Sequence, residues 1–399
     1  MFHYLKNERV KLYLTYPFFI LFIVLFLHSR AFSLDFSLSL DPYLYSSWLF
    51  NYQYGFMKRG LVGETLSFLN ISRDYNHVRL IAIFILLSLY YLLYILIIKT
   101  LINLKLKNNE VLTYACCFFF CSFTLSQFIL EMSRFDQIFQ ILVILFLILL
   151  LKKANIYLCS CYIFIAIPLI TLIHEAGIII FIPTLLLLYY LQYKQVIPIF
   201  LFSIYAFISI ILISYFGKIN ADQLQLLVEN YQTYRGYNEF AFRTTSLSLY
   251  DNLIMNYHSF IDNKMLVPLT LCLTIIAPVI FFVIKSIPQK KYLWLFIFSM
   301  SPLALSVIAF DYFRWISLFL FNSIILLIYL INSNIIQSTQ LLYNLNKYKK
   351  KILLYSLLSL FLGPLGVVNL YPHIHVNNNG GLSTKNLPIE IHQKLNFLH

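Results

Sequence analysis

RLIAIFILLSLYYLLYILII, residues 79–98, is a run of twenty residues in which Arg79 carries the only charge. An α-helix needs about 20 apolar residues to cross the roughly 30 Å hydrocarbon core of a bilayer. The rest of the chain has the same character: 60% of its 399 residues are hydrophobic, 11% are charged and the mean hydropathy is +0.78. Water-soluble domains do not have this composition. The sequence therefore predicts an all-α polytopic membrane protein.

Ten further apolar segments bring the predicted number of transmembrane helices to about eleven. The spans are expected at about 14–30, 79–98, 111–131, 133–151, 156–173, 177–193, 196–216, 265–284, 293–310, 315–332 and 352–371. We interpret residues 1–399 as a single integral membrane domain. Its larger outer segments are a first loop at 31–78, a second loop at 217–264 and a C-terminal tail at 372–399. Because the number of spans is odd, the two termini are expected on opposite sides of the membrane.

The distribution of charge predicts the orientation of the chain. Short cytoplasmic loops are enriched in lysine and arginine, and placing the lysine-rich loops inside leaves 14 of the 16 acidic residues and 8 of the 9 arginines outside. The N-terminus is then cytoplasmic. The first span is followed by Arg30 and Phe32 and not by a small-residue cleavage site, so we expect it to remain as an anchor. The net charge of +13 reflects this topology, and no nucleic-acid partner is expected.

Two short outer turns carry both charge signs within one helical turn. They are Arg134-Phe135-Asp136 and Asp311-Tyr312-Phe313-Arg314. Ionisable groups at membrane depth are costly and often functional, and arginine matches the geometry of phosphate oxygens. The alternative is an ion pair that locks two helix ends together. The presence of both motifs on one face favours substrate binding by Arg134, Asp136, Asp311 and Arg314.

His174-Glu175 interrupts an apolar stretch that runs from 156 to 193, and it is a candidate acid–base pair. We expect burial to raise the pKa of Glu175, which makes it the preferred base, followed by His174 and Asp41. A polar helix–helix hairpin tip is the alternative. Asp41 precedes Pro42 and also fits a helix N-cap. The His-Glu pair is not part of an HExxH motif, and we expect neither a metal site nor a cofactor.

GFMKRGLVGE, residues 55–64, is a basic turn punctuated by glycines. Gly60 and Gly63 permit close backbone approach, while Lys58 and Arg59 suit a lipid-linked phosphate. Snorkelling of both cations to lipid headgroups is the alternative. The preceding stretch 42–56 is aromatic and uncharged, which predicts a helix or re-entrant segment at headgroup level.

In the second large loop, Arg235 and Arg243 lie among aromatic residues. This composition suits recognition of sugar and phosphate groups, although an interfacial cap has the same composition. The loop as a whole predicts a short helical cap.

These motifs occur in a fixed order: an Asp after the first span, the aromatic stretch, GFMKRGLVGE, RFDQ, the His-Glu tip and DYFRW. In this layout the chain resembles membrane glycosyltransferases of the GT-C type, and most closely the Wzy-type O-antigen polymerases. The resemblance implies a GT-C-like fold in the bacterial inner membrane with a periplasmic active face. It implies polymerisation of undecaprenyl-diphosphate-linked oligosaccharide repeat units into O-antigen, within lipopolysaccharide biosynthesis.

The resemblance also implies particular ligands and partners. Outer-loop arginines would bind the acidic lipid carrier, and here they are Arg59, Arg235 and Arg243, with Arg134 and Arg314 nearer the bundle. The expected partners are the undecaprenyl-diphosphate-linked glycan and membrane lipid, with a chain-length regulator and a flippase as further protein partners.

Two other function classes remain open. A GT-C glycosyltransferase that adds one sugar from a polyprenyl-phosphate donor shares the same topology. A transporter of lipid-linked glycans would instead need ionisable groups near the membrane midplane and access from both faces. Because the charged motifs gather on one face, the sequence favours a transferase over a transporter.

Overall fold

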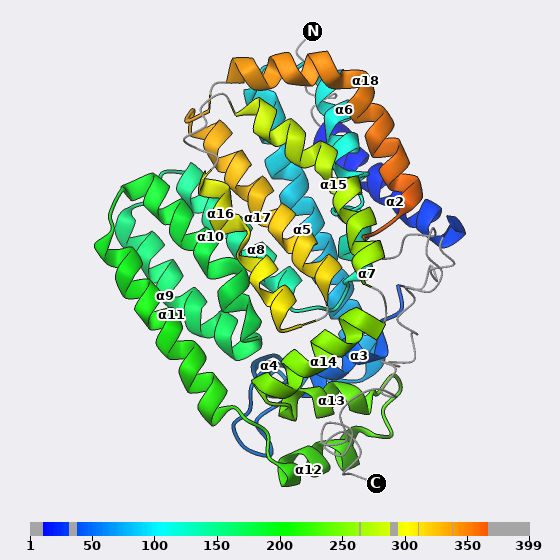
Figure 1. Ribbon diagram of the computed structural model, residues 1–399, viewed down its shortest axis with the longest axis vertical. Helices are drawn as coiled ribbons and strands as arrows, with labels where there is room; N and C mark the ends of the chain where they lie inside the picture. Colours follow the sequence, from blue (N-terminus) through cyan, green and yellow to red (C-terminus); the bar gives the residue numbers. More distant parts are fainter. Residues whose placement is uncertain are drawn as a thin grey trace.

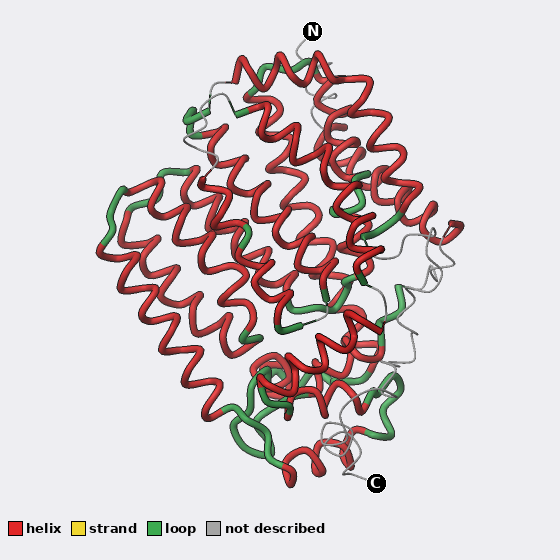
Figure 2. The backbone as a smooth tube through the Cα atoms, viewed as in Figure 1, coloured by secondary structure: helices red, strands yellow, loops and turns green. Residues whose placement is uncertain are grey.

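The computed structural model describes residues 11–31, 38–262, 265–287, 294–309, 311–336 and 338–365. All regular secondary structure in these residues is helical (Figure 2). In chain order the elements are η1 (Lys11–Thr15), α2 (Tyr16–Ala31), α3 (Pro42–Ser46), η2 (Ser47–Leu49), α4 (Leu61–Phe68), α5 (Tyr75–Asn103), α6 (Asn108–Phe119), α7 (Leu125–Leu130), α8 (Asp136–Leu151), α9 (Ile156–Ile173), α10 (Ala176–Tyr193), α11 (Ile197–Phe216), α12 (Ala221–Tyr231), α13 (Glu239–Ser246), α14 (Leu249–Asp262), α15 (Leu266–Ser286), α16 (Phe296–Ser299), η4 (Ser301–Val307), α17 (Tyr312–Asn332) and α18 (Ser338–Leu362).

Five helices are long and apolar enough to cross a membrane, by length and composition: α5, α9, α10, α11 and α17. Shorter apolar helices lie at Leu12–Phe26, Asp136–Leu151 and Leu269–Lys285. The all-helical class predicted from the sequence is confirmed, and the apolar helices indicate a membrane protein. The C-terminal tail predicted at 372–399 lies outside the described residues.

Several predicted spans differ from the helices in the structure. The segment 111–131 is divided into α6 and α7 by a turn at 120–124, and the segment 293–310 forms the short α16 followed by the 3₁₀ helix η4. Both segments are largely apolar, so hydropathy alone could not reveal where their helices break. The lysines at 347–351, predicted in a loop, lie inside α18, which covers the end of the bundle opposite α12 and α13 (Figure 1).

The bundle has α17 and α10 at its centre and α11 at its edge. In the most apolar window of α17, 78% of the residues are buried, against 11% in α11. The buried helices are joined by polar contacts as well as packing. Asn322 of α17 and Ser301 donate hydrogen bonds to the Ile180 carbonyl of α10 at 2.8 and 3.3 Å. These two bonds join the middle of α10 to α17 and to the start of η4.

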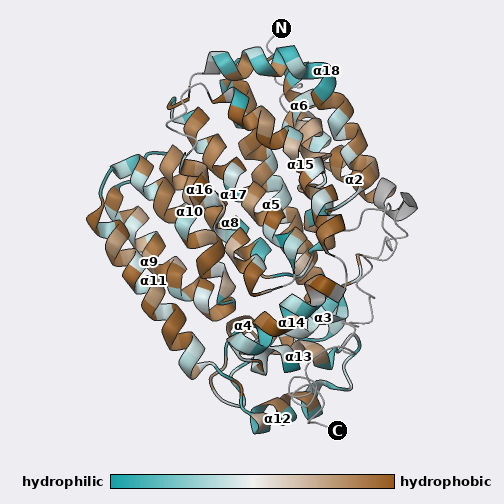
Figure 3. Ribbon diagram, in the orientation of Figure 1, coloured by the Kyte–Doolittle hydropathy of each residue, from teal (hydrophilic) through white to brown (hydrophobic). Residues whose placement is uncertain are grey.

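One end of the bundle is covered by a cap built from the two large loops. It contains α3, η2 and α4 from the first loop and α12, α13 and α14 from the second (Figure 1), and more polar side chains gather there than along the bundle (Figure 3). Aromatic contacts hold the cap in place: the rings of Phe50 and Phe242 lie 4.7 Å apart and join the two loops, and the ring of Trp48 lies 5.3 Å from that of Phe135, just before α8.

The predicted headgroup-level segment 42–56 is therefore part of this cap. Tyr45, Trp48 and Phe50 are fully buried in protein contacts, and the Trp48 indole donates to the Ser133 carbonyl at 2.8 Å. Aromatic, uncharged sequence fits a lipid interface and a buried loop equally well. Only the partner loop, about 180 residues later in the chain, decides between them.

The close backbone approach predicted for the glycine turn is made to the protein itself. A Cβ on Gly63 would clash with the carbonyl oxygens of Phe50 and Trp48, whereas a Cβ on Gly60 would meet the ring of Tyr52. The main chain at Phe50 is held by the packing of the cap, while a side-chain ring can rotate away.

We expect Gly63→Ala to destabilise the protein by about 1–3 kcal/mol or more, because overpacking against a fixed backbone cannot relax. Gly60→Ala is the matched control and should have a smaller effect. Thermal unfolding of the detergent-solubilised protein, followed by size-exclusion chromatography, measures both. Equal melting temperatures for the two variants would contradict this account of Gly63.

Candidate functional site

A pocket of about 520 Å³ lies where the cap meets the end of the bundle. We call it the ion-paired pocket. The Lys58-Arg59 turn, the residues before α8, the tip between α9 and α10, the end of α11, and the segments around α14 and the start of α17 all contribute to it. Residues from almost the whole length of the chain therefore meet in one cavity.

The tip between α9 and α10 is bound by the glycine-punctuated turn. The Arg59 guanidinium donates to both carboxylate oxygens of Glu175, from Nε at 3.1 Å and from Nη2 at 2.7 Å. The Lys58 ammonium lies 3.9 Å from the same carboxylate. Arg59 has a φ of +66°, a left-handed conformation that is uncommon for residues other than glycine. Such backbone strain persists only where surrounding contacts hold it, and the bidentate pair is one of them.

This pair overturns the expected pKa of Glu175. Burial acts to raise the pKa, as expected, but attraction to Arg59 outweighs it and the pKa lies well below its ordinary value. Glu175 is therefore ionised and weakly basic. A weak base takes up a proton less readily, so the structure does not favour Glu175 as the general base. The sequence places Arg59 more than a hundred residues away, so the pairing was not visible in it.

His174 is held as a neutral hydrogen-bond donor. Its Nδ1 accepts the backbone N–H of Ala176 at 3.2 Å, so in the neutral ring the proton lies on Nε2. Burial and the nearby Arg59 lower the pKa of His174 to about 3, which leaves the ring neutral at any physiological pH. A nitrogen that already carries a proton cannot accept one, so Nε2 is suited to donate to a ligand oxygen.

The wall of the pocket between α8 and α17 is a chain of alternating charges. Asp136, the first residue of α8, accepts from Arg314 of α17 at 2.6 and 3.0 Å. Asp311 accepts from Arg314 and from Arg134, each at 3.0 Å. Arg134 also pairs with Glu131. The ion pair between helix ends, left open as the alternative by the sequence, is therefore present, and it forms between the two motifs.

The residues of this wall differ in how deeply they are buried. Asp136 and Arg314 are buried, and all three guanidinium nitrogens of Arg314 donate to carboxylates. The side chains of Arg134 and Asp311 are 17% and 30% exposed. Burial acts to raise the pKa of Asp311, but Arg134 and Arg314 hold it at about 2. The geometry thus assigns Asp136 and Arg314 to the wall, and leaves Arg134 within reach of a ligand.

The side chains that line the pocket carry an excess of positive charge. Five cations (Lys58, Arg59, Arg134, Lys218 and Arg314) face two carboxylates (Glu175 and Asp311). Counting Glu131 and Asp136, which pair with two of these arginines but do not line the cavity, still leaves one positive charge in excess. Hydroxyl groups of Tyr43, Ser47, Thr244, Thr245 and Ser248 add hydrogen-bonding capacity.

The sequence analysis missed Lys218 and Glu131. Lys218 follows α11 and Glu131 ends α7, and only the arrangement of the helices brings them to the site. A lysine just outside an apolar helix normally indicates a membrane boundary, so the sequence held no signal that would have singled it out.

Asp136 does not line the pocket itself, and three further predicted site residues lie outside it. Asp41 caps α3 by accepting the Leu44 N–H at 3.1 Å, which confirms its structural interpretation. Arg235 lies 5.3 Å from the centre of the Tyr75 ring. Arg243 donates to Glu239 one helical turn earlier, at 2.8 and 2.5 Å. Both arginines of the second loop therefore contact protein groups: Arg235 lies over a ring at the start of α5, and Arg243 pairs with a carboxylate of its own helix, α13.

The arrangement is chemically suited to an oxyanion with more than one negative charge. Arg59 and Arg134 line the cavity from two separate ion pairs, and Lys58 and Lys218 are also among the lining residues. Their partners Glu175 and Asp311 keep the guanidinium groups oriented in the absence of a ligand. Such preorganised donors stabilise charge that develops on a leaving group.

Removing one member of the buried pair should destabilise the fold. For Asp136→Ala we expect a loss of about 3–5 kcal/mol, because the buried Arg314 would lose two of its three carboxylate hydrogen bonds and would share the Asp311 carboxylate with Arg134. Lys349→Ala is the control: it breaks the partly exposed pair with Glu110 at 3.7 Å, leaves the α6 cap made by Glu110 in place and should cost less than about 1 kcal/mol. Thermal unfolding compares the two, and similar melting temperatures would argue against a structural role for the wall.

The tautomer of His174 can be observed directly. We expect the ¹⁵N spectrum of histidine-labelled protein to show one neutral ring protonated at Nε2, with no change between about pH 5 and pH 8. Comparison with His174→Gln assigns the signal. Gln places an amide donor near the Nε2 position and Asn places one near Nδ1, so Gln should preserve ligand binding better than Asn. Protonation of the ring near pH 6 would refute the assignment.

Comparisons with known proteins give no further information about this site. The chain matches no protein-family model, no curated protein and no solved structure. The composition of the ion-paired pocket and its position at one end of an apolar helix bundle are the observations that bear on function.

Proposed function

We propose that this protein polymerises undecaprenyl-diphosphate-linked oligosaccharide repeat units into O-antigen or a related surface polysaccharide. In this proposal it is a GT-C-like glycosyltransferase of the bacterial inner membrane with about eleven spans, and its active face is periplasmic. The observation that carries the proposal is the cationic ion-paired pocket at the end of a bundle of apolar helices. A lipid-linked diphosphate needs a site of this kind, with positive charge at membrane depth.

The directions of the central helices support the proposed orientation. The helices α8, α10 and α17 all begin at the pocket, with Asp136, Ala176 and Tyr312 as their first residues. At their far ends, α8 and α10 are followed by Lys152 and Lys194. The lysine-rich ends and the pocket therefore lie at opposite ends of the bundle, as expected if lysines mark the cytoplasmic side.

The mechanism that fits this pocket relies mainly on electrostatic stabilisation. In the transfer step, a hydroxyl of the acceptor glycan attacks the anomeric carbon of the donor, and the bond to the diphosphate breaks. Arg59 and Arg134 would bind the departing diphosphate, while Lys58 and Lys218 add positive charge. The neutral His174 would donate a hydrogen bond from Nε2 to a substrate oxygen.

Glu175 and Asp311 are the pocket carboxylates that could receive the hydroxyl proton, and both have pKa values below their ordinary range. A weakly basic carboxylate is sufficient when the bond to the diphosphate is largely broken before the acceptor hydroxyl loses its proton. We therefore keep Glu175 as a candidate proton acceptor whose main function is to orient Arg59.

Deletion of the gene tests the polymerase proposal. We expect the mutant strain to lose the ladder of long surface glycans while retaining single repeat units. A plasmid carrying the wild-type gene should restore the ladder, and Arg59→Lys should not, because Lys keeps the charge but loses the bidentate fork. Arg235→Lys is the matched control outside the pocket and should restore long chains. A normal ladder in the deletion strain would reject the proposal, and loss of a single sugar would indicate a one-step transferase.

A further inference from the structure

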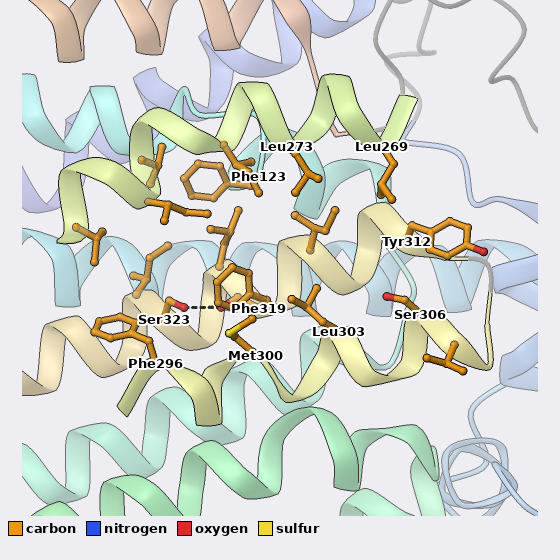
Figure 4. Close-up of a pocket in the computed structure, with 18 of the residues that line it drawn as sticks. Phe123, Leu269, Leu273, Phe296, Met300, Leu303, Ser306, Tyr312, Phe319 and Ser323 are labelled. Atoms are coloured by element: carbon orange, nitrogen blue, oxygen red, sulfur yellow. Dashed lines mark hydrogen bonds between the residues drawn. The ribbon is translucent and has the colours of Figure 1, made fainter. Parts of the chain in front are cut away.

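An apolar trench of about 940 Å³ lies on the side of the bundle, beside the ion-paired pocket. Its walls are α15 on one side and η4 with α17 on the other (Figure 4). The lining runs from Leu269 to Ile284 on α15 and from Tyr312 to Leu327 on α17. Fifteen residues of helix correspond to about 22 Å at about 1.5 Å per residue. The trench is therefore long and narrow, and it follows the helix axes.

The trench is suited to hydrocarbon because its lining is mostly apolar and three of its five polar side chains are bonded to protein groups. The Tyr312 hydroxyl donates to Asn256 Oδ1 at 2.7 Å, and the amide nitrogen of Asn256 donates to the Ser306 and Val307 carbonyls at 2.9 Å each. Ser323 bonds to the Phe319 carbonyl at 2.9 Å. A polar ligand would give up hydrogen bonds to water and find few partners for them in the trench. An apolar chain makes no such hydrogen bonds, so it loses none on entering.

The trench is also accessible from the side of the bundle. Leu273 and Ile284 on α15 are 50% and 48% exposed, although both line the cavity. A chain that is already dissolved in the bilayer could therefore enter laterally between the helices. A closed cavity of the same volume would instead suit a small compact ligand.

The trench and the ion-paired pocket share a wall. On α17, Asp311 precedes the helix and faces the ion-paired pocket, while Tyr312 faces the trench. On α14, Met255 faces the ion-paired pocket and Asn256 faces the trench. Neighbouring residues thus line a cationic cavity on one side and an apolar one on the other.

We infer that the trench holds the polyprenyl chain of the lipid-linked substrate whose diphosphate occupies the ion-paired pocket. This inference rests on the proposed function for the identity of the headgroup. The anionic head and apolar chain of one amphiphile match the two adjoining cavities in charge and in shape. The chain begins at the Tyr312 end of the trench and runs along α15 and α17 toward Phe296 (Figure 4).

Binding measurements on the purified full-length protein test this inference. The probes are undecaprenyl diphosphate, geranyl diphosphate as a short-chain counterpart, and phosphatidylglycerol as an ordinary bilayer lipid. The variant is Leu273→Trp, which places a large ring in the trench at a position exposed enough to accept it. Leu303→Trp on the opposite wall is a second variant, and Leu266→Trp is the control on the exposed surface of the same helix.

We expect both trench variants to raise the Kd for undecaprenyl diphosphate by about tenfold, because the ring displaces several buried methylene groups. The Kd for geranyl diphosphate should change by less than about twofold, and Leu266→Trp should behave as wild type. Equal effects of Leu273→Trp and Leu266→Trp would overturn the inference. Competition by phosphatidylglycerol as strong as that by undecaprenyl diphosphate would overturn it in favour of an ordinary lipid site.

The binding results and the glycan ladder are independent measurements, so failure of this inference can be distinguished from failure of the proposed function. A normal glycan ladder in the deletion strain, together with chain-dependent binding, would reject the polymerase and keep the lipid site. Loss of the ladder, together with equal binding of long and short diphosphates, would keep the polymerase and reject the trench.

Discussion

The end of the bundle depends on the buried ion pair between Asp136 and Arg314. Two charges in a low-dielectric interior are stable only when both are paired and hydrogen-bonded. Here the pairing joins the first residue of α8 to the first turn of α17, and Asp311 extends it to Arg134. The chain of charges therefore fixes the relative position of the two helices and, with it, the wall shared by the two cavities.

The same wall explains how a cationic site can exist at the end of an apolar bundle. An unpaired arginine at this depth would be costly, so each pocket arginine has a carboxylate partner at short distance. Because the pairs Arg59–Glu175 and Arg134–Asp311 are partly exposed, a stronger anion could compete for these guanidinium groups. Arg314 is more deeply buried and has three carboxylate contacts, so its pairs are much less open to exchange. The difference in burial divides the arginines into binding and supporting roles.

The cap has a second consequence for the site. It buries Phe50 against Phe242 of the second loop and Trp48 against Phe135, the residue before α8. The cap thereby holds the Lys58-Arg59 turn over the tip between α9 and α10. The backbone N–H of Lys58 donates to the Gly217 carbonyl at 2.9 Å, which ties that turn to the end of α11 and brings Lys218 to the pocket. Cations from two distant loops thus reach one cavity because aromatic packing joins the loops.

The sequence by itself determined the helical class, the ends of α9, α10 and α17, and the identity of most charged residues at the site. These follow from apolar length and from isolated charges in apolar sequence, which are local properties. The partners of those charges, the low pKa of Glu175, the breaks in two predicted spans and the membership of Lys218 were decided only by the tertiary structure. Hydropathy measures how much apolar surface a segment has and contains no information about which distant segment covers it. Pairing in a buried site depends on distances between residues more than a hundred positions apart, and only the packed bundle sets those distances.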